Sequence, residues 1–306
     1  MKGIYAIFLL GLLVLASGCV QPSEGGERPV KTSATDGIVI NEFSSDLTRY
    51  ESTESIPLYL EIENVGGTTA KSVNVTILGA SWETATTKLE KSFGDLSPPD
   101  LTVSPPVPGD FKTWTTTLSA FTDVPQGVET EVTLTARVEY GYSSNGAVHV
   151  DVLSKDEYKR RIQKGEAIPT APTVENSAGP IHIDIDPRGL PPILTDSREN
   201  VSALILLENV GSGVPIGEGG AEGNISVTLT LTGLNAKFIK CLDTAATGNK
   251  KSITLKTQLR RGESAKIPCT IEIDKPTAHD TFTILFETEY TYYVEQPLTL
   301  TIVGAS

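Results

Sequence analysis

Three polar side chains alternate along one short segment and are the first candidates for chemistry. His182, Asp184 and Asp186 occur in the run HIDIDP. Alternate residues of a strand point to one face, so all three could reach one cation. A calcium ion needs about six to eight oxygen ligands, usually supplied by a DxDxDG loop, and no such loop accompanies the run. The more ordinary interpretation is a polar strand face, and we predict no metal site and no cofactor.

Catalytic motifs that spacing alone could reveal are missing from the sequence. It contains no GxSxG, HExxH or SxxK, the arrangements that supply a serine nucleophile or a zinc-bound water. Asp and Glu are plentiful, but nothing marks two of them as an acid–base pair. We therefore predict that the protein is not an enzyme. The enzyme alternative, a hydrolase of wall polymers, has no residue assigned to it.

Aromatic side chains are the better candidates for ligand binding. Trp82 and Trp114 could stack on sugar rings, and the second half of the chain lacks a Trp at either matching place. Packing in the core is the competing interpretation. Two tyrosine pairs recur in both halves of the chain: Tyr140 with Tyr142, and Tyr290 with Tyr292. Because they recur, we expect a shared structural role, such as a tyrosine-corner hydrogen bond or a rim of the core.

A glycine-rich segment, residues 211–223, resembles a phosphate-binding loop in composition. It is followed by NISVTLTL, an alternating run typical of a strand, and not by a helix or a GK[ST] sequence. Glu218 and Glu222 would also repel phosphate. We predict a long hairpin loop at the end of a sandwich, where such loops contact partners.

Two of the three cysteines fall in strand-like runs. Cys269 alternates with isoleucines in KIPCTIEI, and Cys241 ends AKFIKC on the same predicted face as Ile239. In an exported protein an even pair most simply forms a disulfide. We predict a Cys241–Cys269 disulfide whose sulfurs point inward, from two facing sheets. Two buried free thiols are the alternative.

The elements that carry these residues occur twice in the chain. IPLYLEIENVG ends at Gly66 and VSALILLENVG ends at Gly211, with similar segments before and after each in the same order. The short apolar–polar alternations have the period of strands with one buried face. We predict an all-β fold of two tandem immunoglobulin-like β-sandwiches, at 37–154 and 178–306, each of about seven strands.

The turn after each ENVG word carries a family resemblance. A strand ending in Asn-x-Gly, at Asn64-Val65-Gly66 and Asn209-Val210-Gly211, followed by another alternating strand, resembles CARDB-like and related immunoglobulin-like domains of prokaryotic surface proteins. The resemblance implies adhesion, spacer or binding modules. Asn and Gly would supply the positive φ of a tight turn. The glycine-rich insertion departs from this pattern in the second copy.

The N-terminus resembles the leader of a prokaryotic lipoprotein. Lys2 precedes an apolar run of about thirteen residues, a length typical of a signal peptide, and Ala16-Ser17-Gly18-Cys19 resembles a lipobox. The resemblance implies cleavage of residues 1–18 and lipidation of Cys19. An ordinary secretory signal with a chance Cys and a retained helix are the alternatives. The polar residues 19–36 would form a disordered tether.

A helix is predicted in the linker at 155–177. Ser154 and Glu157 match a capping box, and Gly165 suits a helix end, so we expect a helix over 155–164 that docks on one domain. Its Lys and Arg residues form either a solvated face or a contact with an acidic neighbour or lipid headgroups.

Charge and modification motifs complete the sequence analysis. The net charge of −13 disfavours nucleic acid as a partner. Asn74, Asn200 and Asn224 begin N-x-S/T sequons that could carry glycans, a feature that leans towards an archaeal origin.

Together these features predict a lipid-anchored cell-surface protein. It would be extracytoplasmic, held to the membrane by Cys19, and would serve as a non-catalytic scaffold or interaction module for envelope or surface proteins. The alternative is an accessory protein of a transport or envelope system that binds glycans or small solutes.

Overall fold

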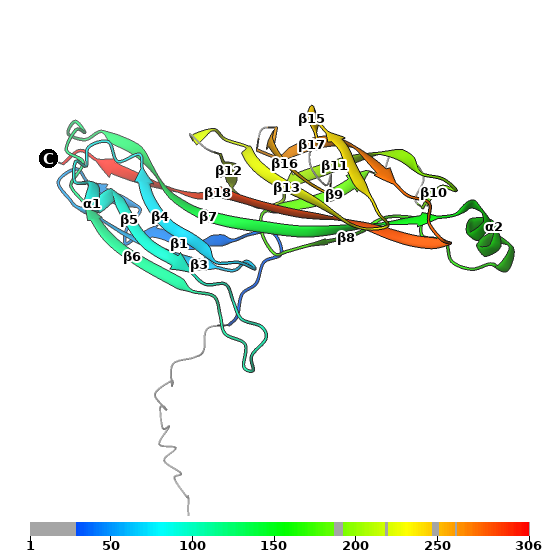
Figure 1. The fold of residues 1–306 in the computed structure, drawn as a ribbon. Coiled ribbons are helices and arrows are strands. Elements are labelled where there is room, and N and C mark those ends of the chain that lie inside the picture. Colours follow the sequence, from blue (N-terminus) through cyan, green and yellow to red (C-terminus); the bar gives the residue numbers. More distant parts are fainter. Residues whose placement is uncertain (1–28, 187–191, 218–219, 247–250, 261, 306) are drawn as a thin grey trace, which may run out of the picture.

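The structure is a computed structural model, which describes residues 29–186, 192–217, 220–246, 251–260 and 262–305. It is built almost entirely of antiparallel strands in sheets packed face to face, which confirms the predicted all-β, sandwich-like fold. The predicted leader 1–18 and Cys19 lie outside the described residues. Figure 1 shows an elongated body with the C-terminus at one end and helix α2 (Lys155–Lys164) at the other.

A 10-stranded sheet runs the length of the molecule. Its order is β16-β13-β18-β7-β4-β5. The six strands are β4 (Ala70–Leu78), β5 (Glu90–Leu96), β7 (Glu129–Leu153), β13 (Asn224–Gly233), β16 (Ser252–Gln258) and β18 (His279–Val303). Four short strands join its sides: β2 (Arg49–Glu51), β8 (Thr173–Asn176), β10 (Ile193–Leu194) and β12 (Val214–Ile216). The order is symmetric about the β7–β18 pair. β4 and β13, which correspond in the two repeats, flank this pair, and β5 and β16 lie outside them.

Two smaller sheets cover this long sheet. The first repeat supplies a 3-stranded sheet of β1 (Ile38–Ser45), β3 (Ile56–Asn64) and β6 (Phe111–Leu118). The second repeat supplies a 5-stranded sheet of β9 (Ile181–Asp186), β11 (Glu199–Asn209), β14 (Lys237–Cys241), β15 (Thr244–Ala245) and β17 (Ser264–Ile273). In Figure 1 the first-repeat sheet lies below β7 and β18 on the left, and the second-repeat sheet lies above them on the right. Long sheets twist along their strands. The face of the long sheet that the smaller sheets cover therefore points down at one end of the molecule and up at the other (Figure 1).

The two repeats exchange their final strands. β7 and β18 are each 25 residues long, and they pair without a register shift from His279 opposite Leu153 to Val303 opposite Glu129. The first half of β7 pairs with β4 of its own repeat, whereas its second half lies beside the first half of β18. Each sandwich is therefore completed by a strand of the other repeat. The boundaries 37–154 and 178–306 describe the repeats along the chain, and the sandwiches in space draw on both.

One apolar core runs through both sandwiches. The even-numbered side chains of β7 from 134 to 152 and of β18 from 282 to 302 are almost all buried or half-buried. The odd-numbered side chains of the same strands face outward and are mostly polar. The buried side chains join into a single cluster that contains residues of both small sheets.

The linker helix forms as predicted. In α2 the Ser154 hydroxyl accepts a hydrogen bond from the Glu157 N–H, and Gly165 ends the helix with φ 65°. None of its residues is buried, and Ile162 is exposed. Its arginines pair with Glu157 and Glu166 close by in the chain. The other helix, α1 (Thr86–Leu89), is one turn that leads into β5.

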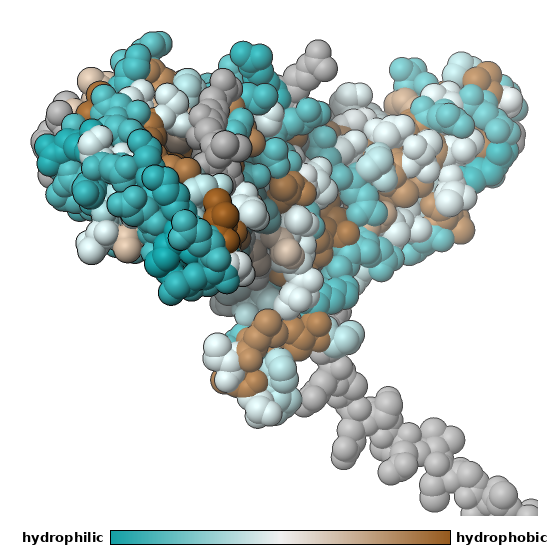
Figure 2. Space-filling view, turned by 90° about the vertical axis from the view of Figure 1, so that its right-hand side faces the viewer, coloured by the Kyte–Doolittle hydropathy of each residue, from teal (hydrophilic) through white to brown (hydrophobic). Residues whose placement is uncertain are grey.

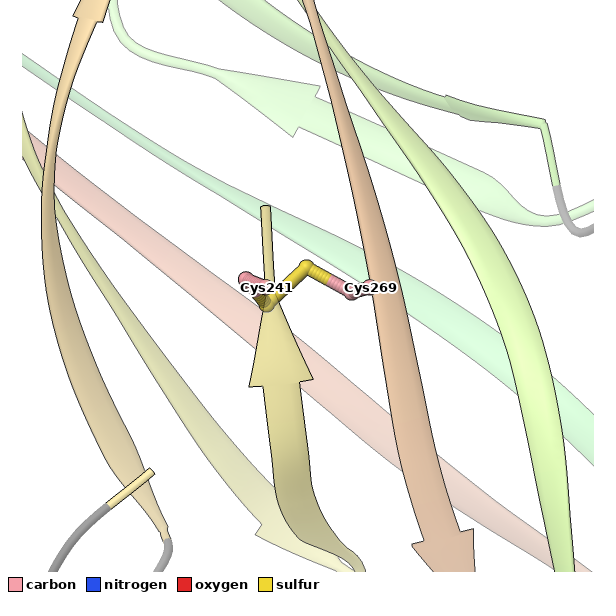
Figure 3. Close-up of a disulfide and its surroundings, with 2 residues drawn as sticks. All are labelled: Cys241 and Cys269. Carbon is pink, nitrogen blue, oxygen red and sulfur yellow. A yellow bond between two sulfur atoms is a disulfide. The ribbon is translucent and has the colours of Figure 1, made fainter. Parts of the chain in front are cut away.

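The predicted disulfide is present, but its setting differs from the prediction. Cys241 ends β14 and lies directly opposite Cys269 on the neighbouring strand β17 (Figure 3). The two cysteines belong to one sheet, not to facing sheets. A register shift between Phe238 and Lys240 moves Phe238 and Cys241 to the buried face, leaving Ile239 half-buried, so the predicted phase of this strand was wrong. A disulfide is typical of an extracytoplasmic environment.

Two segments expected to be irregular carry structure. The glycine-rich segment contains β12, which pairs with residues 291–293 of β18. The last residues of the expected tether are held on the body, because the Ser33 N–H donates to the Val65 carbonyl at 2.7 Å.

Candidate functional site

Four tyrosines meet where the two repeats cross. Tyr140 and Tyr142 lie on β7, Tyr290 and Tyr292 lie on β18, and their strands pair here with Gly141 opposite Thr291, the midpoint of both strands. Neighbouring rings stand edge to face with centroids 5.7–6.4 Å apart. This geometry favours the aromatic quadrupoles. We call this group the tyrosine cluster.

The tyrosine hydroxyls bind the starts and turns of the smaller sheets. The Tyr140 hydroxyl accepts from the Ile38 N–H at 3.0 Å, where β1 begins. The Tyr142 hydroxyl accepts from the Gly67 N–H at 3.0 Å. In the second repeat the Tyr292 hydroxyl accepts from the Gly213 N–H at 3.0 Å and donates to Asn209 Oδ1 at 2.8 Å. The expected structural role of the tyrosine pairs is confirmed by these bonds.

The glycine of each ENVG word is required for a different reason from the predicted one. Neither Gly66 nor Gly211 has a positive φ. A Cβ on Gly66 would lie 2.1 Å from the Tyr142 hydroxyl, and one on Gly211 would lie 2.6 Å from that of Tyr292. The glycines therefore make room for the tyrosines that bind the turn.

Burial keeps three tyrosines of the cluster in their neutral form. Loss of solvent around the phenol groups raises the pKa of Tyr140, Tyr290 and Tyr292 well above the ordinary value. These three hydroxyls consequently stay protonated and act as fixed hydrogen-bonding groups, so they are not suited to acid–base chemistry near neutral pH.

The first described residues dock between the two repeats at the same level. The Gly179 N–H donates to the Ala34 carbonyl at 3.1 Å. The backbone N–H and the hydroxyl of Ser212 lie 3.2 and 3.1 Å from Asp36 Oδ1. Together with the bond from Ser33 to Val65, these contacts join the start of the body to both ENVG turns.

A cleft of about 820 Å³ opens on the outward face of the long sheet beside the cluster. Its floor includes Gly141 and Thr291, where a missing side chain leaves the sheet surface hollow. Lys71 of β4 and Lys256 of β16 lie on opposite sides, with Glu289 between. Its remaining polar lining is hydroxyl and amide: Thr69, Ser143, Asn224, Ser226, Thr257 and Gln258. Such a lining can hydrogen-bond a polyhydroxylated ligand. We call this hollow the central cleft.

The two tryptophans lie away from the central cleft. Trp82 donates from Nε1 to the Ser119 carbonyl at 2.9 Å, and its ring centroid lies 4.7 Å from that of Phe121. Trp82 and Trp114 are both half-buried against the core. The contacts of Trp82 favour the packing interpretation over a sugar platform.

The three candidate metal ligands lie on β9, with His182, Asp184 and Asp186 on its outer face. His182 Nε2 lies 3.2 Å from the Ala34 carbonyl, so the histidine contacts the docked N-terminal segment. Among the described residues no group of three His, Cys, Asp or Glu side chains could hold a metal ion. Within that same part of the chain, no helix has the length and apolarity to cross a membrane.

The sequon asparagines lie in different surroundings. Asn74 and Asn200 are exposed on β4 and β11. Asn224 is half-buried at the start of β13 and lines the central cleft. A glycan at Asn224 would therefore occupy the cleft, whereas glycans at the other two positions would extend into solvent.

The crossing of the repeats and the cleft beside it were not predicted from the sequence. One signal was present: apolar or small residues occupy the even positions without a phase change from Val132 to Val152, straight through SSNG. The run contains Asn145-Gly146, and Asn-Gly is a strong turn signal, so the sequence also favours a break that the continuous strand does not have. Gly146 is instead needed where β8 approaches, since a Cβ there would lie 2.8 Å from the Glu175 carbonyl.

Comparisons with known proteins leave the family open. No family model matches the chain, and no curated protein matches it. Among solved structures, the chain is weakly similar to the secreted serine protease VesC from Vibrio cholerae, with 11% identity, a TM-score of 0.18, and coverage of 79% of this chain and 49% of that one. An alpha-2-macroglobulin mutant from Salmonella has 8% identity and a TM-score of 0.20, and the match covers 88% of this chain and 23% of that one. The collagen adhesin from S. aureus has 6% identity and a TM-score of 0.13, covering 90% and 95%. The chain spans about half the length of the first and a quarter of the second. Similarities this weak carry no argument about function.

Proposed function

We propose that the protein is a lipid-anchored, extracytoplasmic interaction module that presents a rigid body to envelope or surface proteins and catalyses no reaction. The observation that carries the proposal is the exchange of final strands. Because β7 and β18 each run through both sandwiches, no flexible linker lies between them. A body of fixed length suits a scaffold that must hold a partner at a constant place.

Separate observations support the extracytoplasmic location and the lipid anchor. The Cys241–Cys269 disulfide favours an oxidising compartment, and the lipobox resemblance at Ala16–Cys19 supports the anchor. The CARDB-like character and archaeal origin are part of the same proposal and rest on the ENVG turns and the sequons. Since residues 33–36 dock at the crossing of the repeats, an anchor at Cys19 would hold the body near its middle and leave both ends free for partners.

Lysine cross-linking of the membrane-extracted protein in its native envelope tests the scaffold proposal. Lys91 and Lys112 are exposed on β5 and β6, at sheet edges, whereas Lys71 and Lys256 line the central cleft. We expect acyl mass on Cys19 and cross-links from the edge lysines to an envelope protein. Unmodified Cys19 together with no cross-linked partner would refute the proposal.

The central cleft supports a second candidate function, that of a receptor for glycans or small solutes in a transport or envelope system. Its volume of about 820 Å³ is in the range of ligand-binding cavities, and hydroxyl, amide and carboxylate side chains line it. The variant Gly141→Leu should obstruct its floor, and the side chain has room there because the nearest atoms to an added Cβ lie 3.6 Å away.

Retention of the protein on immobilised envelope polysaccharide separates the two candidates. The receptor proposal expects Gly141→Leu to abolish retention, while Thr133→Leu, on the same outward face of β7, keeps it. The scaffold proposal expects both variants to behave alike and to keep the edge cross-links.

A further inference from the structure

One loop of the first repeat projects from the body with an apolar, uncharged tip. Residues 97–110 connect β5 to β6, and positions 101–107 read LTVSPPV, without a charged residue. Leu101, Val103 and Val107 are 60%, 44% and 52% exposed. Figure 2 shows hydrophobic residues on a projection below the body. We call residues 97–110 the apolar loop.

The apolar loop is held in shape at its base and along its stem. Asp100 and Val107 exchange both backbone hydrogen bonds at 2.9 Å. The Thr102 hydroxyl donates to Asp100 Oδ1 at 2.7 Å, and the Ser97 N–H donates to Asp110 Oδ2 at 2.8 Å. Both acidic groups of the loop are thus engaged in hydrogen bonds, Asp110 at its base and Asp100 where the tip begins. The exposure of the tip is therefore a property of an ordered loop, which prolines at five positions stiffen further.

The loop and the N-terminal segment leave the body at the same place. The Asp110 carbonyl accepts from the Asn64 N–H at 3.0 Å, and the next residue, Val65, accepts from the Ser33 N–H at 2.7 Å. Figure 1 shows the first described residues and the loop descending from the same underside of the body. Even fully extended, the chain from Cys19 to Ser33 would reach about 50 Å, so an anchored Cys19 keeps the point where the loop leaves the body within that distance of the membrane.

We propose that the apolar loop inserts its tip into the lipid bilayer as a second membrane contact, a proposal that rests on the lipid anchor at Cys19. Leu101, Val103 and Val107 carry no charge and no hydrogen-bonding group in their side chains, so their burial at the acyl boundary is favourable. The Thr102 hydroxyl is already bonded to Asp100. A lipid surface also needs no matching polar rim, which a protein interface of this kind would need. A single acyl chain binds reversibly, so a second contact would strengthen the attachment and fix the orientation of the body.

Quenching by brominated lipid tests the insertion. The full-length Val103→Trp protein is reconstituted into phosphatidylcholine vesicles with brominated acyl chains, and the emission of the native Trp82 and Trp114 is subtracted using the wild type. Ile162→Trp, on exposed helix α2 at the far end of the body, is the matched control. We expect the added emission of Val103→Trp to be mostly lost and that of Ile162→Trp to be unchanged.

The mass of Cys19 in the same preparation separates this proposal from the anchor. Unquenched Val103→Trp emission in a preparation with acylated Cys19 overturns the loop insertion and leaves the anchor standing; the loop would then be a protein contact. Quenching with unmodified Cys19 supports the insertion and refutes the anchor. As a second measurement, Leu101→Asp with Val103→Asp should lower the membrane affinity of the protein by about tenfold, whereas Ile162→Asp should not.

Discussion

Tyr292 shows how a single hydroxyl group organises a whole turn. It accepts from the Gly213 N–H and donates to the Asn209 side chain, while the Asn209 amide reaches the Gly213 carbonyl at 2.7 Å. Gly211 leaves the space that the hydroxyl fills. The Asn-x-Gly motif and Tyr292, which lies far away in the sequence, consequently form one hydrogen-bonded unit.

Removing that hydroxyl should cost stability. Tyr292→Phe removes the partner of the half-buried Gly213 N–H and of Asn209 Oδ1, so we expect the free energy of unfolding to fall by about 1–3 kcal/mol. Chemical denaturation measures the change. Tyr158→Phe on α2 is the control, and an equally large loss there would contradict this role for Tyr292.

Glu83 makes the stability of the folded protein sensitive to acid. Its carboxylate is buried and accepts hydrogen bonds from the Ser119 N–H at 2.8 Å and the Ala85 N–H at 3.0 Å, with Lys88 Nζ at 3.1 Å. These backbone hydrogen bonds lower the pKa of Glu83 to about 2. A carboxyl group with a depressed pKa stabilises the folded state above its ordinary pKa and loses that contribution as the pH falls towards the folded value.

Stability should therefore fall with acid in a window set by Glu83. Between pH 4.5 and about 2, we expect the free energy of unfolding of the wild type to fall more steeply than that of Glu83→Gln. Denaturation midpoints at several pH values measure both slopes. Parallel slopes would show that Glu83 contributes nothing to this dependence.

At the scale of elements, the disulfide joins two neighbouring strands across a closed loop. Cys241 and Cys269 are separated by 28 residues in sequence, and both are buried. In the chain-entropy account, a cross-link of this length stabilises by about 3–4 kcal/mol, because it restricts the unfolded chain.

Reduction should reveal this contribution. We expect dithiothreitol to lower the unfolding midpoint of the wild type and to leave that of the Cys241→Ala/Cys269→Ala variant unchanged, at the lower value. If reductant shifts the double variant as well, its effect on the wild type cannot come from this disulfide.

How far the elements could be predicted depended on whether their signals were local. Helix α2 followed from Ser154, Glu157 and Gly165, since a cap is a contact between near neighbours. The strand phases followed from alternation, except in β14, where a bulge shifted Cys241 relative to Ile239. No local sequence signal predicts this bulge. The central cleft could not be predicted either, because residues from six strands meet there only through the pairing of β7 with β18.

At the scale of the whole molecule, the exchanged strands couple the two sandwiches. Leu300 belongs to the second repeat in sequence, yet it is buried in the first sandwich, opposite Val132. Its environment thus depends on both repeats. A substitution at Leu300 should therefore destabilise both sandwiches.

We expect Leu300→Ala to destabilise the protein by about 2–5 kcal/mol and to speed amide hydrogen exchange in β3 and in β11 together. Independent sandwiches would instead show faster exchange in β3 alone. Leu47→Ala, at an exposed position, should leave both strands unchanged.

The exchanged strands also have a consequence for biosynthesis. When the ribosome has finished the first repeat, the stretch of β7 from 129 to 139 still has an open edge, because its neighbour at 293–303 is made only after the preceding strands of the second repeat. An open strand edge invites pairing with other chains. The nascent protein must consequently be kept from aggregating until residues 293–303 have been made, and a chain truncated before residue 293 should leave its first sandwich incomplete and be removed by proteases.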